Sequence, residues 1–225
     1  MHVWADLHLQ EEIPAETEAF ALELEERVQG PGTLVIAGDL FNAWTGRGQW
    51  EWPVFQPLAL ALGALKMKGV RVILLRGNRD VLLEPVDGEG VGAEVADGVV
   101  FSAGERRILL THGDEYCLND KPYQRLRHFL RAQPARWALR SLPGFVRRAI
   151  ARSLRKTSQA AIARKPLDSM ALVEDCVRTA LHECEADWAL IGHLHRAEER
   201  DLGKGRKLEV LPAWEPGTLP WTTVD

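Results

Sequence analysis

The sequence predicts an α/β fold, because short apolar, β-branched runs alternate with segments of helical periodicity along most of its 225 residues. Residues 33–37 and 70–75 are mostly apolar, which is typical of strands buried on both faces. Helices are expected at 15–29 and 53–68, each followed by a glycine that ends the helical pattern. In open sheets of this class, ligands bind beyond the carboxyl ends of the strands.

The remaining elements continue this pattern. Strands are expected at 3–5, 108–110 and 188–191, and the segment from Lys207 onward alternates like antiparallel sheet. Residues 84–98 contain five glycines or prolines and are predicted to be a loop. Since no internal repeat or low-complexity segment interrupts the pattern, we expect one α/β core.

The composition excludes several classes of protein. At 46% hydrophobic and 27% charged residues the chain is predicted to be globular, and no stretch has the roughly 18 uncharged apolar residues of a membrane span. The first residues do not resemble a secretory signal, so a cytoplasmic location is expected. An odd number of cysteines without a CxxC spacing argues against a disulfide framework and a thiolate zinc site. These cysteines are Cys117, Cys176 and Cys184.

The net charge of −4 is an average over two unlike parts. Residues 121–167 contain 13 lysines and arginines and no acidic residue, so the rest of the chain has 15 cations against 32 acids. Such a block suggests an anionic partner, which can be phosphate, nucleic acid or a membrane surface. We therefore expect a core at 1–120 and 168–225 and a basic helical cap insertion at 121–167. Prolines divide the cap into short helices at Pro134, Pro143 and Pro166.

Five short clusters of metal-capable side chains follow directly after predicted strands. By itself each cluster is weak evidence, because a polar residue in a turn gives the same pattern, but together they predict one site. The clusters are Asp6-Leu7-His8, Gly38-Asp39-Leu40-Phe41, Gly77-Asn78-Arg79-Asp80, Thr111-His112-Gly113-Asp114 and Gly192-His193-Leu194-His195.

Carboxylate, amide and imidazole groups in this assortment are the ligands of two divalent cations about 3.5–4 Å apart. Asp6 and His8 are two residues apart, as are His193 and His195, so each pair presents both side chains on one face of an extended segment. Two such cations lower the pKa of water and neutralise phosphate oxygens, which favours in-line attack on phosphorus.

In order, the clusters resemble the D-x-H, G-D, G-N-H-D/E, H and G-H-x-H pattern of the calcineurin-like metallophosphoesterases, over residues 6–195. The resemblance implies a four-layer αββα sandwich and two divalent metal ions. It assigns one metal to Asp6, His8, Asp39 and His195. It assigns the second to Asn78, His112, His193 and the bridging Asp39.

The third cluster departs from the family pattern, because Arg79 replaces the histidine that protonates the leaving group. Arginine is not a general acid at neutral pH, but it stabilises phosphoryl oxygens. A diphosphate expels a phosphate group with a pKa of about 6 and needs no proton. Arg79 therefore favours pyrophosphate cleavage, the alternative being a drifted residue in a less active enzyme. Asp80 and Asp114 are expected to orient neighbouring catalytic groups, with helix capping or a salt bridge as the alternative.

Segments outside the metal motifs are similar to the UDP-2,3-diacylglucosamine hydrolases of lipid A biosynthesis. They are residues 111–127, 143–148, 155–158 and 210–214, together with 77–83, where the third cluster continues into Val81-Leu82-Leu83. The resemblance implies hydrolysis of UDP-2,3-diacylglucosamine to UMP and 2,3-diacylglucosamine 1-phosphate, with manganese as the metal. It implies substrate contacts through Asn78, Arg79, Asp120, Ser158 and Lys165. Two positions depart from that family: Asn42 replaces the glutamate of GDLFE, and Ile162 replaces an asparagine of the cap.

The basic block is amphipathic as well as cationic, and Trp137 and Phe145 add aromatic side chains to it. We expect the cap to lie on the cytoplasmic face of the inner membrane as a peripheral contact. A packed helix with a solvated arginine face is the alternative. Nucleic acid is not expected as a partner, because aromatic residues that would stack on bases are sparse here. Two other functions stay open: a phosphoesterase for another nucleotide diphosphate or phosphodiester, and a non-catalytic binding module.

Overall fold

The computed structural model describes residues 1–162 and 171–223, and it contains two five-stranded sheets. The first sheet has the order β10-β1-β2-β3-β4, with β10 antiparallel and the other strands parallel. Its strands are β1 (His2–Trp4), β2 (Gly32–Ile36), β3 (Val70–Leu75), β4 (Ala93–Ala96) and β10 (Trp221–Thr222). The helical segments linked to it are α1 (Pro14–Arg27), η1 (Arg47–Glu51), α2 (Gln56–Met67) and α3 (Pro85–Glu89).

The second sheet has the order β5-β6-β7-β9-β8. Its central strands β6, β7 and β9 are parallel, and the edge strands β5 and β8 are antiparallel to their neighbours. The strands are β5 (Gly98–Ala103), β6 (Arg106–Thr111), β7 (Trp188–Ile191), β8 (Glu198–Gly203) and β9 (Arg206–Val210). Its helical segments are η2 (Asp114–Tyr116) and α7 (Glu174–Glu183).

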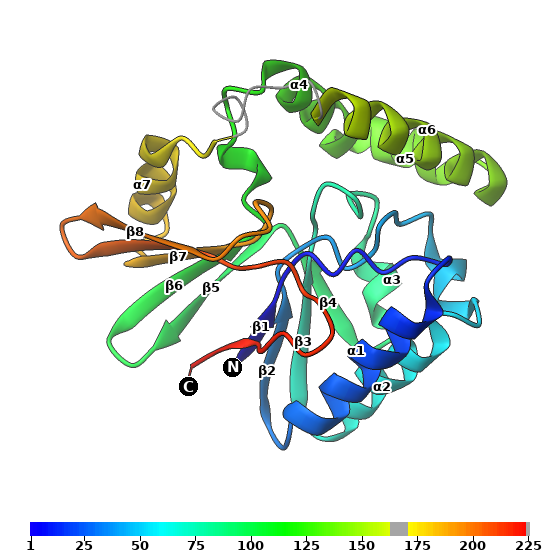
Figure 1. Ribbon diagram of the computed structural model, residues 1–225, viewed down its shortest axis with the longest axis horizontal. Coiled ribbons are helices and arrows are strands. Elements are labelled where there is room, and N and C mark those ends of the chain that lie inside the picture. The colour runs from blue at the N-terminus through cyan, green and yellow to red at the C-terminus, as the bar shows by residue number, and fades with distance from the viewer. Residues whose placement is uncertain (163–170, 224–225) are drawn as a thin grey trace.

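Three hydrophobic cores separate four layers, which confirms the predicted αββα sandwich (Figure 1). On β2, Leu34 and Ile36 face the core under α1 and α2, while Val35 faces the core between the sheets. This alternation follows from the two-residue period of a strand. Val177 and Leu181 of α7 pack on the outer face of the second sheet.

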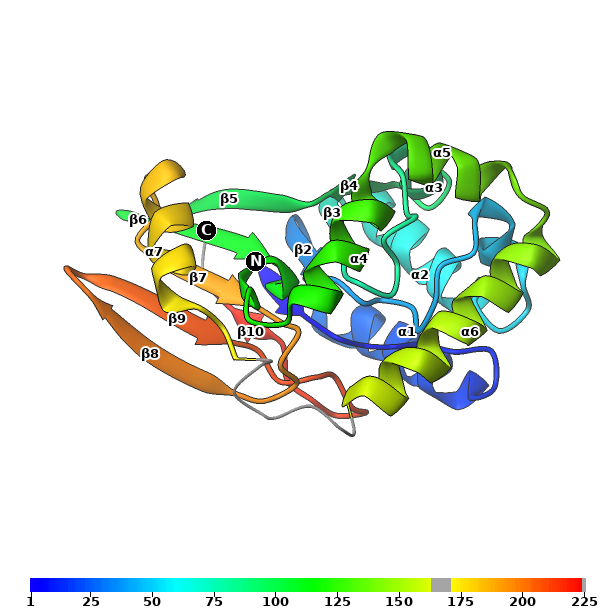
Figure 2. The same ribbon diagram turned by 90° about the horizontal axis from the view of Figure 1, so that it is seen from above.

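The described part of the basic block, residues 121–162, forms three helices that cover the strand ends of the sandwich. They are α4 (Lys121–Arg131), α5 (Gln133–Ser141) and α6 (Gly144–Ile162). Pro134 lies in the first turn of α5 and Pro143 directly precedes α6, as predicted, whereas Pro166 lies outside the described residues. Seen from above, α4 lies over the boundary between the sheets, and α5 and α6 lie over the side of α1, α2 and α3 (Figure 2).

The predicted loop at 84–98 is wrong, because this segment contains α3 and β4. Glu84 and Asp87 form a reciprocal capping box at the start of α3, and Pro85 occupies its first turn. A five-residue helix is too short to show a helical period. β8 was also not predicted, since its sequence is mostly charged and it is held at the sheet edge by pairing with β9. The predicted antiparallel tail is confirmed for the pairing of β9 with β8, although β9 pairs in parallel with β7.

Candidate active site

The five clusters converge where the strand ends of the two sheets meet beneath the cap (Figure 1). Parallel strands bring their carboxyl ends to one edge of a sheet, and the face-to-face packing of the sheets joins the two edges. The candidate ligands follow β1 (Asp6, His8), β2 (Asp39), β3 (Asn78), β6 (His112) and β7 (His193, His195).

Asp6, His8 and His195 form one group of candidate ligands, in which one ligand atom from each residue lies within 4.8 Å of the others. The Nε2 atoms of His8 and His195 are 3.0 Å apart. Asp6 Oδ1 is buried and lies 3.4 Å from His195 Nε2, at ion-pair distance but outside good hydrogen-bond geometry among the described residues. A buried carboxylate oxygen beside two imidazole nitrogens fits a divalent cation, because such a cation would bind all three atoms.

Asp6, Asp39 and His112 form a second group. Asp6 belongs to both groups. Asp39 reaches both sides of the site, with Oδ1 3.7 Å from His112 Nε2 and Oδ2 3.7 Å from His8 Nδ1. His112 Nε2 is 3.1 Å from Asn78 Oδ1, and its Nδ1–H donates to the Ala37 carbonyl at 3.1 Å. That hydrogen bond orients the ring so that Nε2 faces the centre of the site.

The remaining ligand candidate, His193, packs edge-on against the His112 ring, with ring centroids 5.1 Å apart. Its backbone N–H donates to Asp6 Oδ2 at 2.8 Å. The structure therefore brings all seven predicted metal-binding residues to one place.

Backbone strain is concentrated at these same residues. Among the described residues, seven that are not glycine have positive φ, and five of them are ligand candidates. They are Asp6, His8, Asp39, His193 and His195, with φ between 51° and 68°. Left-handed backbone costs about 1–2 kcal/mol for each such residue. Strain of this kind persists where the surrounding structure enforces it, and it is typical of functional sites.

Three motif glycines are needed because their neighbours leave no room for a side chain. A Cβ would overlap the His112 ring at Gly38, the Asp39 carboxylate at Gly77 and the Asp6 carboxylate at Gly192. In each of these motifs, the missing side chain of the glycine leaves space for a candidate ligand that follows a different strand.

The pKa shifts in the site reflect burial together with close contacts between carboxylates and imidazoles. Burial raises the pKa of Asp39 to about 6, and the charge of Asp6 adds to this effect. Burial lowers the pKa of both His8 and His193 to about 4, so these imidazoles are neutral at pH 7, as metal ligands must be. Although burial opposes protonation of His112, the carboxylates of Asp39 and Asp6 raise its pKa to about 9. A bound cation would take the place of that proton, because a histidine that binds metal must be neutral.

Asp80 connects two of the loops that present the ligands. It is fully buried and accepts hydrogen bonds from the N–H groups of Leu40, at 2.9 Å, and Gly77, at 2.7 Å. Burial raises its pKa to about 7, with the charge of Asp39 adding to the shift. Asp80 therefore fixes backbone beside Asp39 and Asn78 rather than reaching toward the centre.

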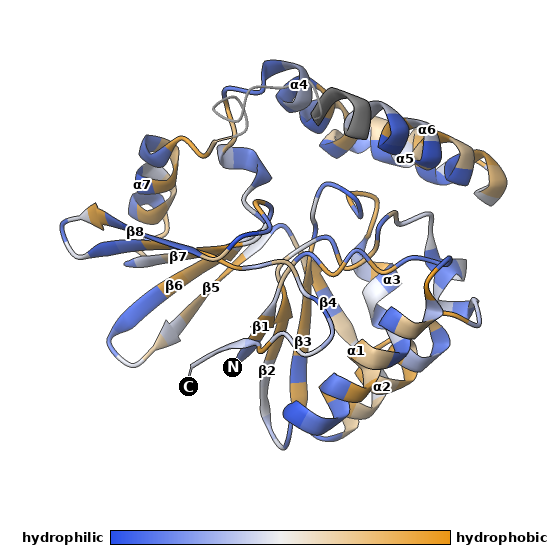
Figure 3. Ribbon diagram, in the orientation of Figure 1, coloured by the Kyte–Doolittle hydropathy of each residue, from blue (hydrophilic) through white to orange (hydrophobic). Residues whose placement is uncertain are grey.

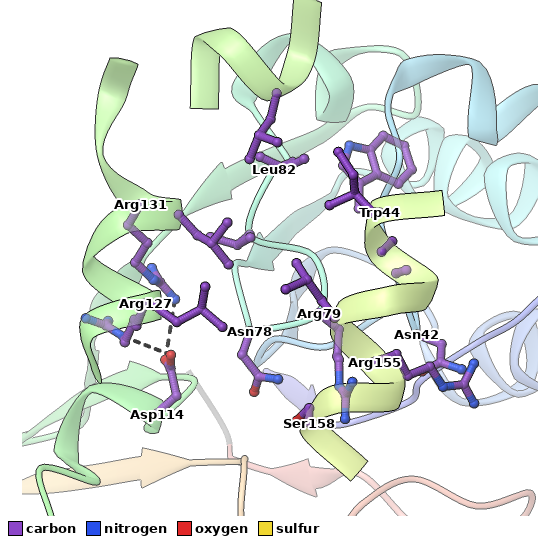
Figure 4. Close-up of a pocket in the computed structure, with 18 of the residues that line it drawn as sticks. Asn42, Trp44, Asn78, Arg79, Leu82, Asp114, Arg127, Arg131, Arg155 and Ser158 are labelled. Carbon is purple, nitrogen blue, oxygen red and sulfur yellow. Dashed lines mark hydrogen bonds and ion pairs between the residues drawn. The ribbon is translucent and has the colours of Figure 1, made fainter. Parts of the chain in front are cut away.

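Asp114 connects the core to the cap, and it forms the salt bridges considered as an alternative role for it. It accepts a hydrogen bond from Tyr123 Oη at 2.5 Å. It also accepts one from Arg127 Nε at 2.8 Å, and Arg131 Nη2 lies at 3.4 Å (Figure 4). Although burial opposes its ionisation, His112 and the two arginines hold the pKa of Asp114 well below its usual range. Tyr123 also stacks on His193, with centroids 6.2 Å apart.

A pocket lies between the cap and the core beside the candidate ligands (Figure 4). Its polar lining includes Asn78, Arg79, Asp114, Arg127 and Ser158. The apolar lining comes mostly from the cap helices and the loop after β3: Val81, Leu82, Leu126, Leu130, Leu139, Ile150 and Leu154. Leu139, Ile150 and Leu154 belong to the amphipathic pattern predicted for the basic block. Sequence reasoning missed Leu126 and Leu130, although their four-residue spacing marks one face of α4.

The predicted substrate contacts lie in different places. Asn78, Arg79 and Ser158 line the pocket, and the Arg79 N–H donates to Asp39 Oδ1 at 2.8 Å. Asp120 is instead buried as the N-cap of α4, where it accepts a hydrogen bond from the Tyr123 N–H at 3.2 Å. Lys165 lies outside the described residues.

Asn42, one of the two departures, contacts the cap. With its amide oriented so that the oxygen faces Arg155, that oxygen accepts hydrogen bonds from both terminal guanidinium nitrogens, at 2.5 and 2.9 Å. Arg155 Nη2 also lies 3.3 Å from Gln10 Oε1. This position therefore joins the Gly-Asp loop to α6.

Comparison with known proteins agrees with the site. Residues 2–197 match the calcineurin-like phosphoesterase family, and the chain belongs to that family. It is 35% identical to a protein of Stutzerimonas stutzeri and 36% identical to one of Pseudomonas paraeruginosa, over 94% of this chain and 89% of each relative. A Bordetella pertussis relative is 35% identical over 98% of this chain and 90% of its own length. All three are named UDP-2,3-diacylglucosamine hydrolase.

Proposed function

We propose that this protein hydrolyses the diphosphate of UDP-2,3-diacylglucosamine, releasing UMP and 2,3-diacylglucosamine 1-phosphate for lipid A biosynthesis. The observation that carries the proposal is the two-sided pocket, which has Asn78 and Arg79 on the metal side and an apolar lining elsewhere. A diphosphate attached to an acylated sugar has the same division of charge and apolar surface. The names of the relatives support this substrate.

The seven ligand candidates support a site for two divalent cations, with Asp39 between the cations. Asp6, His8 and His195 would hold one cation, and Asn78, His112 and His193 the other. The ligands are oxygens and imidazoles without thiolate, which suits Mn²⁺ among divalent metals. When bound, the cations supply activation of water and neutralisation of phosphate charge.

Arg79 is proposed to bind the diphosphate and stabilise negative charge on its oxygens during cleavage. Its backbone is fixed by the hydrogen bond to Asp39, and its Nε is buried without a hydrogen-bond partner in the described structure. A phosphate oxygen would satisfy such a donor. Since the leaving group is a phosphate, no side chain has to donate a proton to it.

The test is a substrate panel with the metal-loaded protein. Release of UMP from UDP-2,3-diacylglucosamine is expected, with little hydrolysis of p-nitrophenyl phosphate or cyclic AMP. The reverse order of activities would refute the proposal. Asp39→Asn is the matched inactive control, because the substitution removes the central carboxylate and keeps the side-chain volume.

We also propose that the cap contacts the membrane that holds this substrate. Trp137 and Phe145 are 75% and 68% exposed, respectively, although both are large apolar side chains of the cap. Hydrophilic and hydrophobic residues alternate along α6 (Figure 3). The arginine-rich helices around them favour anionic lipid. No helix within residues 1–162 and 171–223 is long and apolar enough to cross a membrane.

Sedimentation with vesicles tests this contact. Trp137→Ser with Phe145→Ser should weaken binding to phosphatidylglycerol vesicles. Leu60→Ser, a change at a 74% exposed leucine of α2, should not. Equal binding by both variants would refute a membrane contact through the cap.

A further inference from the structure

Asp87 is a fully buried carboxylate that joins the cap to the core beside the apolar part of the pocket. Arg140 of α5 forms a two-pronged ion pair with it, with Nη1 2.6 Å from Oδ2 and Nη2 3.2 Å from Oδ1. The same Nη1 donates to the Leu82 carbonyl at 2.7 Å. Bidentate pairs fix orientation as well as distance, so α5 is held in one position over the loop after β3.

On the core side, Asp87 is held by further donors. The Glu84 N–H donates to Asp87 Oδ2 at 2.8 Å in the capping box of α3, and Trp44 Nε1 donates to it at 3.3 Å. Trp50 Nε1 donates to the Asp87 carbonyl at 3.1 Å. The carboxylate is therefore a rigid anchor, because any shift would leave buried donors unpaired.

Pocket-lining side chains from three segments meet around this ion pair. Trp44 follows β2, Leu82 follows β3, and Leu139 precedes Arg140 on α5. Arg147 of α6, which also lines the pocket, donates to the Arg140 carbonyl at 3.1 Å. The ion pair therefore sets the distance between the core wall and the cap wall of the apolar pocket.

We propose that Asp87 and Arg140 are positioning residues that determine which acyl-chain lengths the pocket accepts. The inference rests on the proposed function, because it takes acyl chains as the occupant. Neither Asp87 nor Arg140 is among the residues that line the described pocket, so the pair acts through its neighbours rather than on the substrate. Lysine cannot replace the arginine, since an ammonium group lacks the planar fork.

The experiment measures kcat and KM for UDP-2,3-diacylglucosamines with acyl chains from octanoyl to palmitoyl. For Arg140→Met, the KM of the preferred length should rise about tenfold with kcat changed less than about twofold, and the length preference should flatten. Arg140→Lys keeps the charge and should flatten the preference too. Adding Asp87→Asn to Arg140→Met should change the KM and the length preference little further, because the ion pair is already broken.

Arg125→Met is the matched control, because Arg125 is an exposed arginine of α4 and its replacement should leave the length profile unchanged. An unchanged profile in both Arg140 variants would overturn the inference and leave the proposed function intact. Failure of the unmodified protein to hydrolyse any member of the series would overturn the proposed function, and this inference with it.

Discussion

Replacing Asp114 by asparagine should destabilise the protein, because this buried carboxylate binds two cap arginines. Arg127 and Arg131 have side chains only 16% and 15% exposed, so water would compensate little for the lost carboxylate. Each arginine would keep one other carboxylate, Glu115 at 3.6 Å from Arg127 and Asp97 at 2.7 Å from Arg131. Breaking a buried ion pair from one side costs about 3–5 kcal/mol. The asparagine oxygen retains one acceptor, so we expect a loss of about 3 kcal/mol in the free energy of unfolding. For a chain of this size that corresponds to a fall of about 6–12 °C in Tm.

The pH dependence checks the cause of this loss. Because the folded-state pKa of Asp114 is depressed, its contribution to stability is present above the unfolded pKa of about 3.9 and is lost as the pH falls through the lower folded value. We therefore compare the free energies of unfolding of the unmodified protein and Asp114→Asn, both metal-loaded, in urea. The two should differ by the full amount at pH 7 and by less below a pH of about 3.9. A difference below about 1 kcal/mol at pH 7, the range of an exposed ion pair, would show that Asp114 is not a buried partner on which the two arginines depend.

Three further substitutions separate metal binding from turnover. Asp39→Ala should abolish binding of both metals, measured by elemental analysis after gel filtration. Arg79→Ala should retain metal and lower kcat by about 10²–10³; equal loss of metal in these two variants would contradict the assignment. Gly192→Ala should displace the Asp6 carboxylate and weaken metal affinity by at least about tenfold in a competition titration, whereas Gly63→Ala, which has open space around it, should not. Unchanged affinity in Gly192→Ala would show that Asp6 is not a ligand.

The fold and the centre of the site could be predicted because their signals are local. Each candidate ligand directly follows an apolar strand, and parallel strands necessarily bring such positions to one edge. His193 and His195 could therefore be recognised as ligand candidates from their spacing alone, without knowing which distant residues they contact. The same local logic failed at α3, where one capping box and a proline specify a five-residue helix.

The fit between cap and core could not be predicted because it depends on distant pairs. Arg140 and Asp87 are 53 residues apart, and no sequence period links them. The acid-free block suggested cations directed at an external anion, yet Arg127, Arg131 and Arg140 pair with carboxylates of the core. Unequal charge along the chain thus partly reflects attraction between two parts of one molecule.

The proposed reaction breaks the substrate between its two phosphorus atoms. Phosphorus NMR of UDP-2,3-diacylglucosamine hydrolysis in oxygen-18 water identifies both the broken bond and the attacked phosphorus. The expected products are UMP and 2,3-diacylglucosamine 1-phosphate, with oxygen-18 in one of the two phosphates. Release of UDP or of inorganic phosphate, or products without oxygen-18 on phosphorus, would contradict the proposed reaction.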